Sequence, residues 1–134
     1  MEKENKQDIL NRLYIENNLT SEDVFSHQHY KIITRSGVLK ILNNHNIQIE
    51  YDVIVSKENF ASVKARAKMG NKEIETFGSA LKGAGFKDGN TNSLYVLEMA
   101  QKRSMSRGIL ELVGFTALGH YAEDESETFK RNNN

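Results

Sequence analysis

The clearest pattern in the chain is the strict alternation of residues 47–55. Apolar or aromatic side chains stand at every odd position from Ile47 to Val55, and the intervening polar positions are Gln48, Glu50 and Asp52. A period of two is typical of a β-strand with one buried face. The segment therefore predicts a strand that buries its odd-numbered side chains and turns two carboxylates outward.

Two further strands are predicted directly after this one. Residues 60–69 alternate in the same way, with alanine, valine and methionine on the inner face. The outer face is basic and carries Lys64, Arg66 and Lys68. Gly70-Asn71 fits a two-residue hairpin connection of type II′, in which glycine takes the positive φ. The chain then returns as a third strand over residues 72–78, which completes an antiparallel meander.

The short connection also fixes which residues face each other across the second and third strands. With Met69 opposite Lys72, the outward pairs are Lys68 with Glu73, Arg66 with Glu75, and Lys64 with Phe77. A directly opposed ion pair contributes roughly 0.2–1 kcal/mol. Two of the three basic residues are thus expected to meet a carboxylate, and Lys64 is expected to stay available beside an aromatic ring.

A long helix is predicted from Asn92 to Gly114. Asn92 or Ser93 can act as the N-cap, and Gly114 stands where a left-handed residue commonly ends a helix. At 100° per residue, one broad arc is apolar and includes Ile109 and Leu112. This arc is expected to face the core, with Lys102 at its edge extending its amine toward water.

The remaining faces of this helix carry small and charged residues. Ala100, Ser104 and Gly108 form a row that allows another element to approach closely. Arg103 and Arg107 are predicted to point outward on the side opposite the apolar arc. They fit either an ordinary solvated face, with Arg107 paired to Glu111 for about 0.3–0.5 kcal/mol, or a pair of cations aimed at a phosphate backbone.

The N-terminal third predicts short elements. Residues 1–20 have a helical pattern, a second helical piece is expected to hold Val24 and Phe25, and residues 30–33 favour a strand. Residues 36–44 predict another helix, whose N-terminus beside Arg35 could hold an anion or be simply capped. The predicted fold class is α+β: a three-stranded antiparallel β-meander packed against one long C-terminal helix (β-β-β-α), with short N-terminal helices.

Composition narrows the possible classes of protein. The 134 residues include 18 basic and 18 acidic side chains, so bulk charge does not favour coating of duplex DNA, although a local basic groove remains possible. There is no cysteine, no long apolar run and no N-terminal apolar segment, so we expect a soluble, intracellular protein. Residues 1–125 are expected to form one domain, followed by a disordered polar tail over 126–134.

Candidate catalytic chemistry is sparse. The carboxylates Glu50 and Asp52 alternate on one strand without a converging partner set, and the pair His27 and His29 lacks further ligands. No phosphate-binding glycine motif or activated nucleophile is present. We therefore expect no enzymatic activity, no cofactor and no metal site.

Two features together carry a family resemblance. The first is the order of a short helix, a three-stranded meander and a long helix. The second is the run Ala100-Gln101-Lys102-Arg103-Ser104-Met105-Ser106-Arg107-Gly108, followed by Gly114 and the acidic stretch GHYAEDESE. This combination resembles the phage single-strand annealing proteins of the Sak and Erf-like groups, which share a β-β-β-α core with the eukaryotic ring-forming strand-annealing mediator of recombination.

The resemblance implies a phage-encoded protein that binds single-stranded DNA and promotes annealing or homologous recombination. It further implies a homo-oligomeric ring or filament in the cytoplasm of a bacterial host, without a membrane partner. Carried over by position, Lys102, Arg103 and Arg107 match the helix residues that contact phosphates, and Lys64 and Arg66 match the groove wall. An alternative is a protein-interaction module, an inhibitor or adaptor of a host protein, which the acidic run Glu123–Glu127 and the zero net charge favour.

Overall fold

The computed structural model describes residues 5–83, 89–91 and 95–126. The predicted tail beyond Ser126 and the predicted caps at Asn92 and Ser93 lie outside these residues. The elements in chain order are α1 (Lys6–Glu16), β1 (Val24–His27), β2 (Tyr30–Ile33), α2 (Arg35–Asn44), β3 (Gln48–Ser56), β4 (Phe60–Met69), β5 (Lys72–Leu81), α3 (Val96–Val113), the 3₁₀ turn η1 (Thr116–Leu118), β6 (His120–Ala122) and the 3₁₀ turn η2 (Glu123–Glu125).

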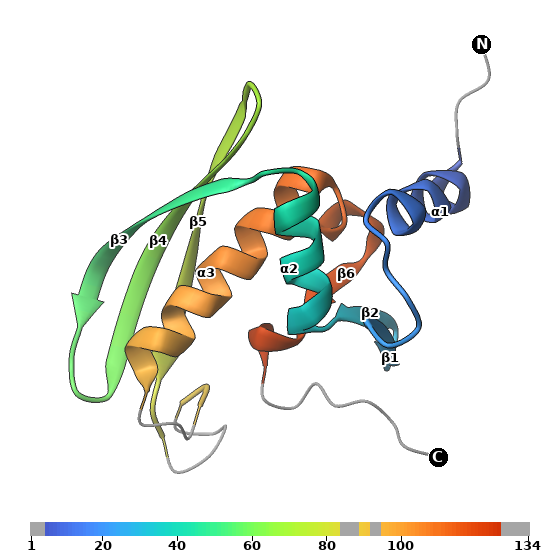
Figure 1. Ribbon diagram of the computed structural model, residues 1–134. Helices are drawn as coiled ribbons and strands as arrows, with labels where there is room; N and C mark the ends of the chain where they lie inside the picture. Colours follow the sequence, from blue (N-terminus) through green and yellow to red (C-terminus); the bar gives the residue numbers. More distant parts are fainter. Residues whose placement is uncertain (1–4, 84–88, 92–94, 127–134) are drawn as a thin grey trace.

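The predicted meander and long helix are confirmed. Strands β3, β4 and β5 form an antiparallel sheet in that order, and α3 crosses one face of it (Figure 1). The predicted register also holds, with Met69 opposite Lys72 and Lys64 opposite Phe77. Gly70 has φ = 59°, as the first turn position of a type II′ connection requires.

Small residues let α3 lie very close to the sheet. A Cβ added to Gly78 would collide with the backbone of Ala100 and Ser104, so this approach needs glycine. One turn further along, the Thr76 hydroxyl donates to the carbonyl oxygen of Ser104 at 2.7 Å. The small-residue row of α3 is therefore the surface that packs on β4 and β5.

A second sheet lies on the other side of α3 (Figure 1). Strand β2 pairs antiparallel with β1 and parallel with β6. The predicted helical piece at Val24 and Phe25 is wrong, because these residues form β1, opposite Ile33 and Ile32. Asp23 accepts from the backbone N–H of Thr20 at 2.9 Å, so the preceding residues form a turn instead of a helix start.

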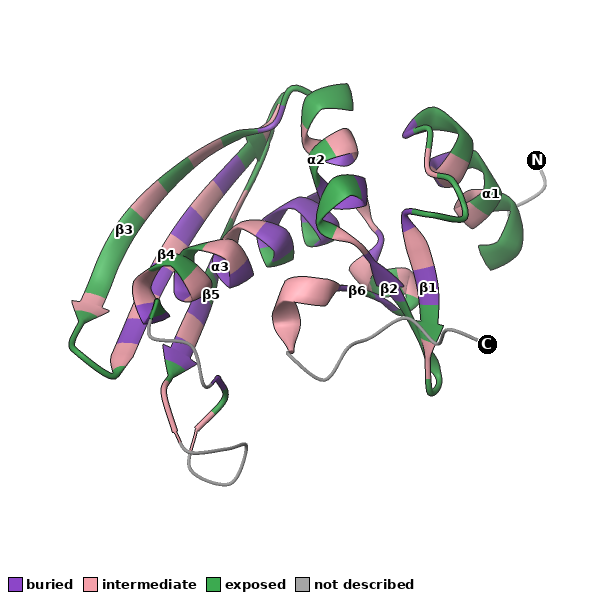
Figure 2. Cartoon of the chain, turned by 60° about the horizontal axis from the view of Figure 1, so that its bottom comes forward, coloured by how far each residue is buried: buried purple, intermediate pink, exposed green. Residues whose placement is uncertain are grey.

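One part of the predicted alternation in β3 fails. Val53 pairs with Val63, but Val55 pairs with Ser62, so the strand has a bulge at Ile54. The bulge moves Val55 off the inner face, and Val53 and Ile54 are more than half exposed. Strand β3 therefore forms a largely exposed margin, whereas the inner positions of β4 are buried (Figure 2).

The main core joins α1, α2 and α3 to the second sheet. Phe115, just after α3, is fully buried, as are Ile33 and Ile109. Within this core the Tyr14 hydroxyl lies 2.6 Å from Nε2 of His120, whose Nδ1 lies 3.0 Å from the carbonyl oxygen of Leu118. A carbonyl only accepts, so Nδ1 carries the proton and Tyr14 donates to Nε2.

Candidate nucleic-acid interface

The outer face of the β3-β4-β5 sheet is a lattice of opposite charges. The Lys64 amine lies 2.9 Å from Glu75 and 3.6 Å from Asp52. The prediction that Lys64 stays available is therefore wrong. Its hydrogen bond with Glu75 raises the pKa of Lys64, and the same bond lowers the pKa of Glu75.

Arg66 is surrounded by carboxylates on both neighbouring strands. Its guanidinium lies 3.3 Å from Glu50, 3.3 Å from Glu73 and 3.9 Å from Glu75. Diagonal neighbours are within reach of long side chains on a sheet, which direct cross-strand register alone does not indicate. Lys68 forms no ion pair with any residue that the structure describes.

The acids on this face are more exposed than the cations they contact. The side chains of Lys64 and Arg66 are 24% and 39% exposed. Their carboxylate partners are 47% to 80% exposed. Water therefore screens these pairs, and each adds little to stability. Because the pairs are weak, another anion can exchange with the carboxylates.

Phe77 interrupts this charged face with an aromatic ring. It stands opposite Lys64 in the register and is 54% exposed. Burial cannot explain a phenylalanine at this position, since the inner positions of β5 are already filled by Thr76, Gly78 and Ala80. The outer face thus combines cations with an exposed ring.

Arg103 is not on the surface, contrary to the prediction from the helical wheel. It is 2% exposed. Its guanidinium donates to three carbonyl oxygens, those of Ser79 at 2.9 Å, Asn90 at 3.1 Å and Asp124 at 2.8 Å. The close packing of α3 on Gly78 brings the Arg103 side chain to the margin of β5. Arg103 therefore holds three separate backbone segments together.

Arg107 lies one helical turn further along, also at the margin of β5. It donates from Nη1 to the carbonyl oxygen of Phe77 at 2.6 Å, and from Nε and Nη2 to the carboxylate of Glu125 at 2.8–2.9 Å. The hydrogen bond to Glu125 raises the pKa of Arg107. The acidic partner is therefore Glu125, and not Glu111 as one interpretation of the sequence had it.

The five predicted cations do not line one groove. Lys64 and Arg66 project from the outer face of the sheet, and Arg107 lies at its margin. Lys102 is half-buried, and at 100° per residue it stands on the side of α3 opposite the small row that packs on the sheet. Of the five, only Lys64 and Arg107 thus face or contact Phe77, and Arg66 lies further along the outer face among carboxylates.

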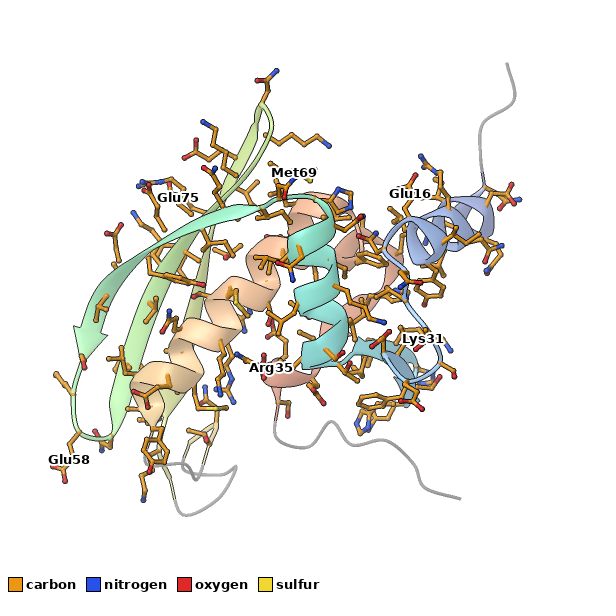
Figure 3. All side chains as sticks on the ribbon, in the orientation of Figure 1. Glu16, Lys31, Arg35, Glu58, Met69 and Glu75 are labelled. Carbon is orange, nitrogen blue, oxygen red and sulfur yellow. The ribbon has the colours of Figure 1, made fainter. Side chains whose placement is uncertain are left out.

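The acidic segment after β6 folds back onto basic residues of the same chain. Glu123 accepts from the backbone N–H of Arg35 at 2.7 Å, at the start of α2. Asp124 lies 3.8 Å from the guanidinium of Arg35, which Figure 3 labels at the start of α2, and accepts from the Ser106 hydroxyl at 3.2 Å. Of the two alternatives for the α2 N-terminus, the cap is found at Thr34, and the anion beside it is a carboxylate of the chain itself.

A cavity of about 270 Å³ opens where α3, η1 and β6 meet. Arg107, Glu111, Tyr121 and Glu125 are among its lining residues. The Tyr121 ring also makes an edge-to-face contact with Tyr30, with centroids 5.2 Å apart. No local pattern indicates this cavity, because β6 is only three residues long and pairs with a strand almost 90 positions earlier.

No family model matches this chain, and neither a curated protein nor a solved structure matches it. In residues 5–83, 89–91 and 95–126, no cluster of three metal-ligating side chains occurs. No helix in this part of the chain is long and apolar enough to cross a membrane.

Proposed function

We propose that this protein binds single-stranded DNA on the outer face of the β3-β4-β5 sheet and promotes strand annealing in homologous recombination. The observation that carries this proposal is the exposed ring of Phe77, which stands directly opposite Lys64 on this charged face. Single strands are bound by aromatic side chains that stack on bases and by basic side chains that contact the backbone. Stacking contributes about 1–3 kcal/mol per base and tolerates any sequence.

The carboxylates on this face set the strength of binding. A phosphate that reaches Lys64 or Arg66 takes over contacts now made by Glu75 and Glu73. The exchange replaces one exposed ion pair with another, so the net gain at each site is small. Stacking on Phe77 therefore supplies much of the affinity, and the cations position the backbone.

Arg107 holds the backbone of Phe77 in place from the margin of the sheet. Its hydrogen bond to the Phe77 carbonyl joins the long helix to the strand position that carries the aromatic side chain. This contact holds the backbone of the platform and keeps a third cation within the same region. The arrangement gives each subunit one small contact area, with Lys64 opposite the ring and Arg107 at the backbone of the same residue.

A small contact area per subunit calls for several subunits on one strand. The whole chain has no net charge, so long-range attraction to DNA is weak. A homo-oligomeric ring or filament would align many Phe77 platforms, and linked weak sites give high overall avidity. We place such an assembly in the cytoplasm of a phage-infected bacterium, as the family resemblance implies.

Fluorescence anisotropy with a labelled oligonucleotide tests this function. We expect wild type to bind a single-stranded oligonucleotide in a salt-dependent manner, and Phe77→Ala to weaken binding on the order of tenfold. Tyr95→Ala is the matched control, because Tyr95 is 70% exposed but precedes α3 on the other face of the sheet. Absence of wild-type binding, or equal binding by Phe77→Ala, would reject the proposal.

One observation favours the alternative of a protein-interaction module. Among the described residues, β3 is an edge strand that pairs with β4 alone, and its Val53 and Ile54 are 55% and 53% exposed. An open strand of this kind can accept an added strand from a partner. Light scattering separates the two functions, since a monomer or dimer without DNA binding fits an adaptor and a large assembly fits annealing.

A further inference from the structure

The contacts of Arg107 aim its guanidinium into the cavity between α3 and β6. Nη1 is fixed by the Phe77 carbonyl, which leaves the edge formed by Nε and Nη2 facing Glu125. This edge offers two parallel donors, the geometry that recognises a carboxylate or a phosphate in a bidentate manner. Glu125 occupies it with both carboxylate oxygens.

The cavity beside this edge has room for more than a side chain. Its volume is about 270 Å³, and Tyr121 lies on its wall. Tyr121 is 37% exposed and is braced by Tyr30. An oxyanion site next to a supported aromatic ring has the two features that one nucleotide needs, a partner for the phosphate and a surface for the base.

We infer that this cavity is a second single-strand subsite, in which Arg107 binds a phosphate, Tyr121 stacks on the adjoining base, and the Glu125 carboxylate holds the phosphate position until DNA displaces it. This inference rests on the proposed single-strand binding. The added site lies beside α3 and β6, whereas Phe77 lies on the outer face of the sheet. Arg107 contacts both, because its Nη1 binds the Phe77 carbonyl and its other edge faces the cavity.

The η2 turn, which carries Glu125, is held in place by contacts that do not involve the Glu125 side chain. Arg103 binds the Asp124 carbonyl at 2.8 Å, Ser106 binds the Asp124 carboxylate at 3.2 Å, and the Arg35 backbone binds Glu123 at 2.7 Å. The Glu125 side chain can therefore leave Arg107 while η2 stays in place. Displacement needs only a side-chain rotation.

The acidic residues that line the cavity weaken its binding of free anions. Glu111 and Glu125 both line the cavity with Arg107, so it has one more acid than base among these residues. An isolated phosphate gains little from such a site. A strand already held on the Phe77 face has a high local concentration there, and it can compete with a tethered carboxylate.

Charge-neutral variants of the two acids test this subsite. We expect Glu125→Gln to raise affinity for a single-stranded oligonucleotide on the order of tenfold, because the competing ion pair is lost. Glu111→Gln makes the same charge change in the same cavity, but no hydrogen bond links Glu111 to Arg107 in the described structure, so its gain should be much smaller. Adding Tyr121→Ala to Glu125→Gln should remove most of the gain.

The outcomes separate the subsite from the proposed function. If Phe77→Ala weakens binding but Glu125→Gln binds no better than Glu111→Gln, the subsite is rejected and single-strand binding stands. If neither wild type nor Glu125→Gln binds, both are rejected. Binding by Glu125→Gln alone, abolished by Tyr121→Ala, supports the subsite and rejects the sheet face.

A measurement on wild type covers the case in which a variant fails to fold. The Arg107 Nε–H proton donates to Glu125 at 2.8 Å, so its NMR resonance reports the exchange of one oxyanion for another. We expect a shift of this resonance on saturation with an oligonucleotide and none with the matching nucleosides. An unchanged resonance at saturation would overturn the inference.

Discussion

Arg103 of the long helix donates to the carbonyl oxygen of Ser79 at 2.9 Å, so a helix residue closes the open margin of the last strand. Two other carbonyls share the same guanidinium. Because Arg103 is 2% exposed, its charge is stabilised by these oxygens and hardly by water. The residue that the family motif assigns to phosphate contact is here part of the framework.

Replacing Arg103 should therefore cost stability before it affects any ligand. Arg103→Ala leaves the Ser79, Asn90 and Asp124 carbonyls without this donor and opens a cavity, and we expect a loss of about 3–5 kcal/mol. Urea denaturation followed by circular dichroism measures this loss. Lys57→Ala, at an exposed position in the turn between β3 and β4, is the control and should change stability by less than about 0.5 kcal/mol. Equal midpoints for the two variants would contradict the framework role.

The contact between α3 and the sheet predicts a graded response to added methyl groups. A Cβ at Gly78 would collide with backbone atoms of Ala100 and Ser104, which cannot rotate away. A Cβ at Gly108 would lie 3.2 Å from the Ala67 side chain and 3.3 Å from the Thr76 hydroxyl, which can yield slightly. We expect Gly78→Ala to lose at least about 3 kcal/mol.

Gly108→Ala should cost far less than Gly78→Ala. Alanine improves helix propensity by about 1 kcal/mol, which offsets part of the crowding. Thermal unfolding of both variants gives the comparison, and Gly108→Ala is the internal control for a methyl group at the same interface. A larger loss for Gly108→Ala would mean that the helix sits differently on the sheet.

The sequence predicted the meander well because local signals agree there. Alternation, the Gly70-Asn71 turn and strand lengths all indicate one register, and that register is found. Of the second sheet only β2 was predicted, at residues 30–33. The other two strands escaped prediction because they are three or four residues long. The β2–β6 pairing joins residues 31 and 120, a separation that no local pattern indicates.

The candidate site was predicted less well than the fold, for a related reason. A helical wheel sorts residues into two sides, apolar and polar, but α3 packs against β4 and β5 and also against α2 and β6. Small residues face one sheet, so Arg103 beside them is drawn inward. Glu125, which pairs with Arg107, comes from a turn 18 residues later, and only the folded chain brings the two together.

The pair Tyr14 and His120 predicts a pH dependence of stability. Burial lowers the pKa of His120 below its ordinary value, and nearby Lys31 lowers it further, against the Leu118 hydrogen bond. As pH falls through the ordinary histidine pKa of about 6.5, His120 is therefore protonated in the unfolded chain but stays neutral in the folded chain. Stability should thus decrease from pH 7 toward pH 5, since protonation removes the acceptor for Tyr14.

Urea denaturation across this pH range checks the His120 effect. The readout is the difference between wild type and His120→Gln, because other groups titrate equally in both. We expect wild type to lose more stability than His120→Gln between pH 7 and pH 5. Parallel pH profiles for wild type and His120→Gln would show that His120 does not titrate in this way.

The salt dependence of DNA binding distinguishes the cations on the outer face of the sheet from the cation on the far side of α3. Each phosphate contact on a single strand contributes a slope of about −0.7 to the logarithmic dependence of affinity on salt. If Lys64 and Arg66 contact phosphates, Lys64→Ala with Arg66→Ala should reduce that slope by roughly 1.4. Lys102→Ala is the control, because it also removes a positive charge. Lys102 lies on the far side of α3, so this variant should leave the slope unchanged. A reduced slope for Lys102→Ala alone would move the interface from the sheet to the helix, and an unchanged slope for the double variant would remove the sheet face as the DNA-binding surface.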